Sequence, residues 1–243
     1  MVFRPALWMT IAAIPALAIL IWLGSWQVMR MQWKGALIEE FTTRANAEAI
    51  APPAASAADS NRFQRITARG LWMHHAEIQL TGRTFEGTAG YHVITPMKLD
   101  DGRVLLMNRG WVSQDYRLPE DRPSTLAAGP QTVDAIIRLP AQKGYFVPEN
   151  DIADNHWFTL NIAEIAAHHG LVDVIQTYTA DVLRPEGDYV LPIGADIEID
   201  IPNNHLNYAI TWYGLGLGLV GVYFAWHHQA GRLRLRQREK GQQ

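Results

Sequence analysis

The chain contains nine histidines and no cysteine, which restricts the metal chemistry available to it. Without cysteine there is no disulfide framework, no CxxC redox pair, no thiolate zinc or copper site and no covalently attached c-type heme. A bound metal must be held by His, Asp, Glu, Met or Tyr. Imidazole is the best of these ligands for a soft metal or a heme iron. The histidines are therefore the first residues to consider as metal or heme ligands.

Eight of the nine histidines lie where a structural role is expected. Four form adjacent pairs, whose side chains diverge on a strand or helix and rarely chelate one metal. Two precede a basic tail, which favours a position at a membrane interface, and two lie among aromatic residues and are expected in the core. The adjacent pairs are His74–His75 and His168–His169. The two residues before the basic tail are His227–His228, and the two among aromatic residues are His92 and His156.

His205 is the exception, because it begins an apolar segment that is rich in aromatic residues. At helical spacing one face of this segment carries a nitrogen ligand, two aromatic side chains below it and a glycine gap deeper in. These residues are His205, Tyr208, Trp212 and Gly216. A porphyrin inserted edge-on would find all three features. An interfacial histidine above an aromatic belt accounts for the same pattern, and the spacing alone leaves both interpretations open.

Two segments without charged residues are the elements that must position the His205 face. No Asp, Glu, Lys or Arg occurs in the 25 residues between Arg4 and Arg30 or in the 31 residues between Asp200 and Arg232. Residues 7–26 and 205–226 are predicted to be transmembrane helices, because about 20 residues at about 1.5 Å each cross the hydrocarbon layer. The first segment could instead be a cleavable signal peptide, but its apolar run continues beyond the small residues at 16–18. We expect an uncleaved signal anchor.

The formal charge is divided unevenly along the chain, and this predicts the topology. It is +1 at the N-terminus, −8 over Gln27–Asn204 and +4 over Gly231–Gln243. The basic tail outweighs the two basic residues beside the first span, so the positive-inside rule places both termini in the cytoplasm. The region between the spans then faces the periplasm of a bacterial inner membrane, or a mitochondrial intermembrane space. Because this region is acidic, nucleic-acid binding is excluded.

The remaining segments follow from these two spans. Residues 1–6 are predicted to be a cytoplasmic N-terminus, 27–44 a helical extension of the first span and 45–61 an Ala/Pro linker. Residues 62–204 are predicted to form a periplasmic β-rich domain, and 227–243 a basic cytoplasmic tail that also touches membrane lipid.

A hydrophobic period of two predicts at least six strands in the domain. They cover Phe63–Trp72, His75–Leu80, His92–Leu99, Val104–Val112, Thr132–Leu139 and Val174–Leu183. One helix is expected at Ile162–His169, because Asn161 can cap its first turn and Gly170 can end it. The predicted fold class is a membrane protein in which two transmembrane helices flank an α+β domain with a mostly antiparallel sheet or small barrel.

The sequence carries no recognised catalytic motif, since HExxH, GxSxG and a Walker loop are absent. The only acidic and histidine triplet of interest, Asp151, Asp154 and His156, has no recognisable reaction geometry, so an enzyme is not expected.

Glycines in the second span match GxGxxG by letter, but they follow no strand and fail the context required for a dinucleotide site. Gly214 and Gly218 form GxxxG and, with Gly221, leave a strip where another helix or a flat ligand can approach closely.

Four motifs, in order, cover nearly the whole chain. The first span ends with LGSWQVMR at Leu23–Arg30, and the domain contains GYHVITP at Gly90–Pro96 and NRGWV at Asn108–Val112. The second span opens with NNHLNYAITWY at Asn203–Tyr213. Together they resemble the LGxWQxxR, GYxVITP, NRGWV and NNHLxYAxTWY motifs of the Surfeit locus protein 1 family (Shy-type), which are assembly factors of cytochrome c oxidase.

The resemblance implies a membrane-anchored assembly factor whose partner is the catalytic subunit of cytochrome c oxidase. In bacterial members it also implies binding of heme a and assistance in its insertion into that subunit. His205 is then the candidate axial ligand of the heme iron, with Tyr208 and Trp212 beside it. Proteins of heme a synthesis or delivery are further candidate partners.

Other motif residues leave more than one role open. Trp26 and Arg30 are i, i+4 neighbours at the same interface, where Arg30 could pair with a heme propionate or a lipid phosphate. In NRGWV, Arg109 could meet an acidic partner, Gly110 permits a bulge or a close approach, and Trp111 can bury a large area. A scaffold that holds an oxidase subunit without touching heme also remains open.

The charge partition makes a topological prediction. Reporter fusions should give a cytoplasmic signal after Gln243 and a periplasmic signal at any site within Asp59–Asp200, because the basic tail is retained inside. Paired alkaline phosphatase and fluorescent protein fusions measure this directly. A cytoplasmic signal from the domain would contradict the whole topology.

Overall fold

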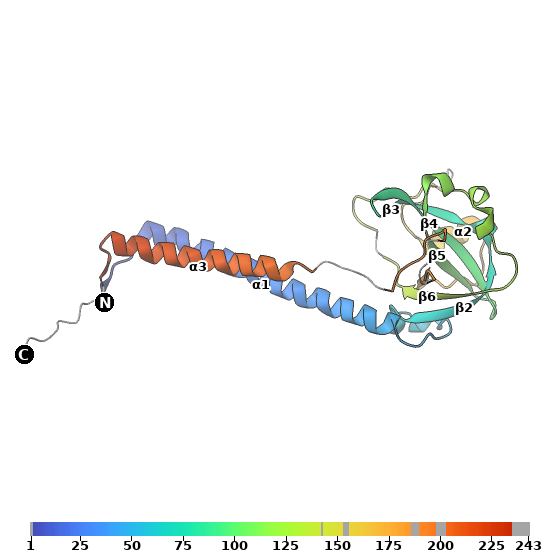
Figure 1. The fold of residues 1–243 in the computed structure, drawn as a ribbon, viewed down its shortest axis with the longest axis horizontal. Helices are drawn as coiled ribbons and strands as arrows, with labels where there is room; N and C mark the ends of the chain where they lie inside the picture. The colour runs from blue at the N-terminus through green and yellow to red at the C-terminus, as the bar shows by residue number, and fades with distance from the viewer. Residues whose placement is uncertain (1, 142, 153–155, 186–189, 198–202, 235–243) are drawn as a thin grey trace, which may run out of the picture. The chain divides into compact units, whose positions relative to one another are not determined.

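The computed structural model describes residues 2–141, 143–152, 156–185, 190–197 and 203–234. The chain forms two compact units, one made of Met1–Glu39 with Asp200–Gln243 and the other of Glu40–Ile199. The predicted class is confirmed: two apolar helices, at the two ends of the chain, flank a mixed, mostly antiparallel β domain (Figure 1).

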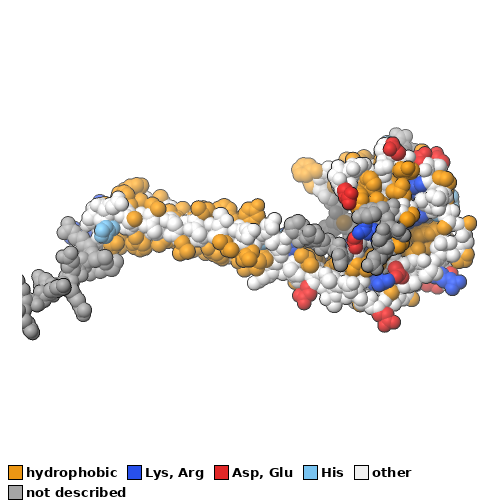
Figure 2. Space-filling view, in the orientation of Figure 1, with side chains coloured by type: hydrophobic (Ala, Val, Ile, Leu, Met, Phe, Trp, Pro, Cys, Tyr) orange, Lys and Arg blue, Asp and Glu red, His pale blue; other side chains and the backbone are white. Residues whose placement is uncertain are grey.

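The first unit is an antiparallel pair of helices, α1 (Leu7–Ala45) and α3 (His205–Gln229). Both are long and apolar enough to cross a membrane. The hydrophobic side chains along their outer surface (Figure 2) include Leu7, Trp8, Ile11 and Leu217, each more than 60% exposed. A surface of this kind suits hydrocarbon rather than water, and helices satisfy their own backbone there.

The ends of the two helices are joined by His227. Its Nδ1 donates to the carbonyl oxygen of Tyr223 at 2.7 Å, and its Nε2 accepts from the backbone N–H of Ala6 at 3.0 Å. The side chain is fully buried. His227 therefore caps the start of α1, a role that its position before the basic tail did not indicate, whereas His228 is exposed. Just beyond, β1 (Val2–Phe3) pairs with β8 (Leu233–Arg234).

The second unit is built on a closed ring of strands. The strands are β2 (Arg65–Trp72), β3 (Ile78–Phe85), β4 (Thr88–Leu99), β5 (Val104–Ser113), β6 (Gln131–Arg138) and β7 (Thr179–Val182). Their order is β2-β6-β7-β5-β4-β3, and an extra β2–β4 pairing closes five of them into a small barrel with β3 on its edge. Every pairing is antiparallel except β5–β7.

Alternation along the strands sends one set of side chains into the barrel and another onto its outer face. The inner cluster draws on all five barrel strands and includes Ile66, Met97, Leu105, Ile137 and Ala180. The outer cluster includes Leu80, Ile94, Leu106 and the fully buried Trp157, and it is covered by α2 (Ile162–His169). The predicted ends of α2 are confirmed: the Asn161 side chain accepts from the backbone of Glu164, and Gly170 is left-handed.

Two predicted strands differ from the observed ones. His74–Ala76 form a short 3-10 turn, so β3 begins at Ile78 and continues to Phe85 through an irregularity beyond Leu80. The strand predicted over Val174–Leu183 is reduced to Thr179–Val182. Strand β3 continues to Phe85 because β4 pairs with it as far as Thr88. Val174 forms only an isolated bridge with Val104, so the continuous pairing of β7 begins later. Pairing is a tertiary property.

The segment predicted as an Ala/Pro linker lies against the domain. Arg103 donates from its two terminal nitrogens to the carbonyl oxygens of Pro53 and Pro52, at 2.6 and 2.7 Å. The hydroxyl of Tyr178 donates to the same Pro53 oxygen at 2.8 Å, and Ala58 is buried. These bonds satisfy a stretch of chain whose composition offers no hydrophobic pattern of its own.

Two motifs, GYHVITP and NRGWV, pair with each other as neighbouring strands β4 and β5. Their register shifts at one point, where Val93 lies opposite Gly110 and Ile94 opposite Asn108, so Arg109 is the extra residue of a β-bulge. Gly110 has a φ of +122°, and an added Cβ would lie 2.0 Å from the carbonyl oxygen of Ile193. Both roles expected of this glycine, a bulge and a close approach, are confirmed.

Gly110→Ala should therefore destabilise the domain by at least about 2 kcal/mol, since left-handed strain and a backbone clash add together. Gly129→Ala is the matched control, because Gly129 also has a positive φ but nothing within 4 Å of an added Cβ. It should cost about 1 kcal/mol. Near-UV circular dichroism during thermal unfolding measures both, and equal losses would show that the Ile193 contact is unimportant.

Candidate functional site

The motif that ends the first span meets the motif that opens the second. His205, in the first turn of α3, places its Nδ1 2.7 Å from Oε1 of Gln27 on α1. An amide oxygen can only accept, so the proton of this bond belongs to Nδ1 and His205 donates. In the neutral form of the ring, Nε2 is then the nitrogen with a free lone pair. A histidine oriented in this way is in the tautomer required for ligation through Nε2.

The same motifs pack tightly one turn further along. An added Cβ on Gly24 would lie 2.8 Å from the ring of Tyr213, so only glycine leaves room for this tyrosine. The Tyr213 hydroxyl is 3.1 Å from the Ser25 hydroxyl. Gly24, Ser25 and Gln27 therefore form a docking strip for α3, and this strip determines where His205 lies.

The four residues of the predicted face, His205, Tyr208, Trp212 and Gly216, differ in how much of each is covered by α1. Gly216 is buried against α1, with Leu17 and Leu20 3.4 and 3.9 Å from the position of an added Cβ. Tyr208 is 56% exposed, and Trp212 is half-buried. The expected glycine gap for a porphyrin is thus wrong at Gly216, because α1 occupies it.

The other glycines of α3 are open. Gly214, Gly218 and Gly221 have nothing within 4 Å of an added Cβ and lie on the exposed surface of the helix. Helix packing was one of the two roles expected for the strip of Gly214, Gly218 and Gly221. Within the chain, the glycine that packs against α1 is Gly216.

Trp26 and Arg30 lie on α1, one residue before and three residues after Gln27. Trp26 is 45% exposed, and the Arg30 guanidinium lies 4.1 Å from the ring centroid of Trp33. The structure does not bring these two side chains into a bond with His205. Arg30 remains exposed and available to an anion.

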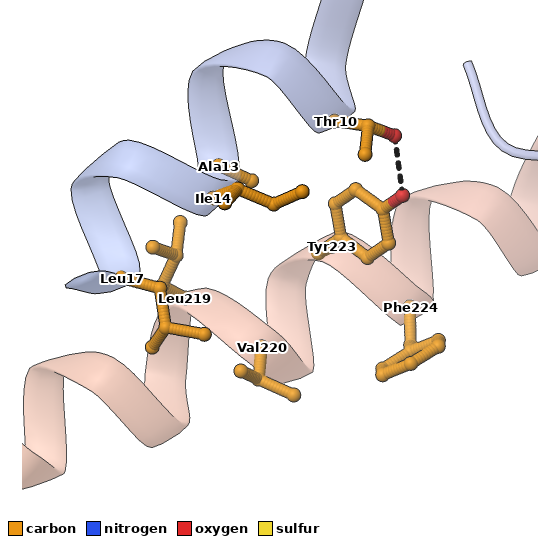
Figure 3. Close-up of a pocket in the computed structure, with 8 residues that line it drawn as sticks. All are labelled: Thr10, Ala13, Ile14, Leu17, Leu219, Val220, Tyr223 and Phe224. Carbon is orange, nitrogen blue, oxygen red and sulfur yellow. Dashed lines mark hydrogen bonds between the residues drawn. The ribbon is translucent and has the colours of Figure 1, made fainter. Parts of the chain in front are cut away.

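Nearer the start of α1, the helix pair carries an apolar groove of about 260 Å³. Its walls are Thr10, Ala13, Ile14, Leu17, Leu219, Val220, Tyr223 and Phe224 (Figure 3). The hydroxyls of Thr10 and Tyr223 are hydrogen-bonded across it at 2.6 Å. No histidine or carboxylate lines the groove, so it suits a hydrocarbon chain rather than a metal.

In the domain, the NRGWV arginine has an internal role. Arg109 packs over Trp72, lies 3.8 Å from the buried carboxylate of Glu77 and donates to the carbonyl oxygen of Thr125 at 2.6 Å. Arg122 forms a buried ion pair with the same Glu77. Burial lowers the pKa of Arg109 to about 10, which leaves it charged at neutral pH. Within the domain, Arg109 therefore interacts with Glu77 and Thr125.

The remaining candidates are Asp151, Asp154 and His156. Asp151 and His156 exchange backbone hydrogen bonds at 2.9 and 2.8 Å, while Asp154 lies outside the described residues. Among the described residues, no group of three His, Asp or Glu side chains could hold a metal ion.

A model of the SURF1 family matches residues 14–217, which include most of α1, the domain and the first half of α3. The chain belongs to the SURF1 family. Surfeit locus protein 1 of Takifugu rubripes is 31% identical over 220 residues, covering 84% of this chain and 90% of that protein. The human protein of the same name is 31% identical over 219 residues, covering 83% and 72%. A SURF1-like protein of Rickettsia conorii is 31% identical over 215 residues, covering 84% and 85%.

The resemblance drawn from four motifs is thereby confirmed, and the structure adds a relation among them. Two SURF1 motifs pair as β4 and β5, and the other two meet where α1 and α3 cross. Gln27 is the site residue that sequence reasoning missed. It was part of the first motif, but its role depends on a partner 178 positions away.

The chain's lack of cysteine permits a direct test of the helix register. The Leu20 Cβ is 3.9 Å from the position of a Gly216 Cβ, within the range of about 3.5–4.5 Å found in disulfides. The double variant Leu20→Cys/Gly216→Cys should therefore oxidise to an internal disulfide, measured by protection from a maleimide–polyethylene glycol reagent. Leu20→Cys/Gly218→Cys should not, because Gly218 faces outward. Equal protection in both would contradict this register.

Proposed function

We propose that this SURF1-family chain is an assembly factor for heme-copper cytochrome c oxidase, which binds heme a as cargo and assists its insertion into the catalytic subunit. His205 is the proposed axial ligand of the heme iron. The observation that carries the proposal is the hydrogen bond from His205 Nδ1 to Gln27, because it leaves Nε2 with a lone pair at the end of an apolar helix.

The local chemistry fits a heme. Neutral imidazole is a good ligand for iron, and a second-sphere acceptor on its other nitrogen raises its basicity. Tyr208, Trp212 and Trp26 are at least partly exposed aromatic residues that can cover an apolar macrocycle. Arg30 offers a guanidinium for a propionate, with lipid phosphate as its competitor. With Gly216 covered by α1, the heme is held at the outer end of the helix pair rather than along it.

The proposed setting is a bacterial inner membrane with both termini in the cytoplasm. His205 then lies at the periplasmic end of the second span, beside the domain-bearing compartment. The catalytic subunit is the proposed recipient, and proteins of heme a synthesis or delivery are proposed donors.

A second candidate function is a membrane-anchored scaffold that stabilises an oxidase intermediate without heme. It is favoured by the open strip of Gly214, Gly218 and Gly221, where another helix backbone can approach closely. The two functions differ in what the purified protein binds.

The test compares four variants of the full chain in detergent. His205→Ala should lose most bound heme a. Gln27→Leu should weaken heme binding by about 10- to 100-fold, as loss of a second-sphere partner does, whereas Gln27→Glu should retain it. His228→Ala is the control, because it is exposed at the opposite end of α3 and, unlike His227, does not join the helices. Heme stoichiometry and the Soret band are measured.

Unchanged heme content in His205→Ala would overturn the ligand assignment. If no variant, including the parent chain, binds heme a while Gly218→Leu reduces co-purification of the catalytic subunit, the scaffold is the correct function.

A further inference from the structure

Four polar side chains, one from each of four neighbouring strands, are linked across the outer face of the barrel. Nδ2 of Asn108 on β5 is 3.2 Å from Nδ1 of His92 on β4. The same Nδ2 donates to Oδ1 of Asp181 on β7 at 2.9 Å. Oδ2 of Asp181 accepts from Nε of Arg138 on β6 at 2.7 Å. We call these residues the His92 ladder.

The ladder determines where the proton of His92 lies. The Asn108 amide can have only one orientation, because its oxygen accepts from the Gly110 N–H at 3.1 Å and its nitrogen faces a carboxylate. Its second hydrogen therefore points to Nδ1 of His92, which must accept. The proton is on Nε2. Burial lowers the pKa of His92, and the positive charge of Arg83 lowers it further, so the ring is neutral at neutral pH and Nε2–H is a donor.

A cleft of about 460 Å³ opens beside the ladder. His92, Asn108 and Asp181 form part of its wall together with Arg83, while Leu80, Ile94, Leu139, Val147, Phe158 and Leu160 make much of the rest apolar. Each oxygen of the Asp181 carboxylate already accepts from a ladder donor, and Arg138 is its ion-pair partner. Lys143, also in the wall, is paired with Glu149.

Two nitrogen donors in the wall remain for a ligand. Arg83 makes no ion pair or hydrogen bond with the rest of the described chain, and the ladder leaves the Nε2–H of His92 unused. A guanidinium and a neutral N–H in a mostly apolar cleft match one negative charge attached to a hydrophobic body.

We propose that the His92 cleft is a binding site for a carboxylate carried on an apolar group, with Arg83 and His92 as its donors. The site lies wholly in the domain unit and does not depend on the heme proposal, whose residues belong to the helix unit. Either can fail without the other.

The probe is 3-phenylpropionate, with its uncharged amide as the matched ligand, titrated into the full-length protein in detergent. Binding is followed by nitrogen NMR of histidine-labelled protein. In the free protein, the His92 signals should be those of a neutral ring protonated at Nε2. We expect saturable binding of the probe, which shifts these signals. The amide should bind about tenfold more weakly, since one charge-assisted hydrogen bond is lost. Arg83→Gln should weaken binding of 3-phenylpropionate by a similar factor.

Arg69→Gln is the control, because Arg69 is an exposed arginine of the same domain paired with Asp100. It should bind the probe like the parent chain. Equal affinity for the carboxylate and the amide, or an Arg83→Gln variant that binds like the parent, would overturn the proposal. A His92 ring protonated at Nδ1 would overturn the ladder on which it rests, and so would absence of saturable binding in a protein that shows native histidine signals.

Discussion

Hydrocarbon provides no hydrophobic force to bring two apolar helices together, so α1 and α3 must be joined by close packing and by buried polar contacts. The structure has both along the whole pair. Ala6 bonds to His227, Thr10 meets Tyr223, Leu17 packs on Gly216, and Gly24 accommodates the ring of Tyr213. The last contact of this series is Gln27 with His205. The candidate ligand therefore belongs to the same system that sets the helix register.

A similar constraint organises the domain, where polar side chains lie among packed strands and each needs a partner. The β-bulge at Arg109 sends that guanidinium to the buried Glu77 and leaves Asn108 with the His92 ladder. Gly110 permits both because, without a Cβ, it leaves room for the backbone carbonyl of Ile193. One irregularity in a strand pairing thus separates the ion cluster around Glu77 from the His92 ladder.

Much of this fold could be predicted from residue patterns. The two spans follow from the absence of charge, α2 from its cap and terminal glycine, and the β4 and β5 strands from alternation on either side of an Asp-Gly turn. The lengths of β3 and β7 could not, because a strand ends where its neighbour ends. The buried state of His227 was also missed, since an adjacent pair of histidines before a basic tail gives no sign that one of them caps a helix 221 positions earlier.

The sequence by itself determined the family, through the resemblance of its four motifs. It also determined the two apolar helices and His205 as the histidine to examine, because these depend on composition and on local spacing. Only the tertiary structure decided how the glycines are used, with Gly216 against α1 and Gly218 open, and which nitrogen of His205 is free. The physical reason is that helical spacing assigns residues to a face but does not say what covers that face. Likewise, a histidine's tautomer is set by the group opposite it, which here comes from the other end of the chain.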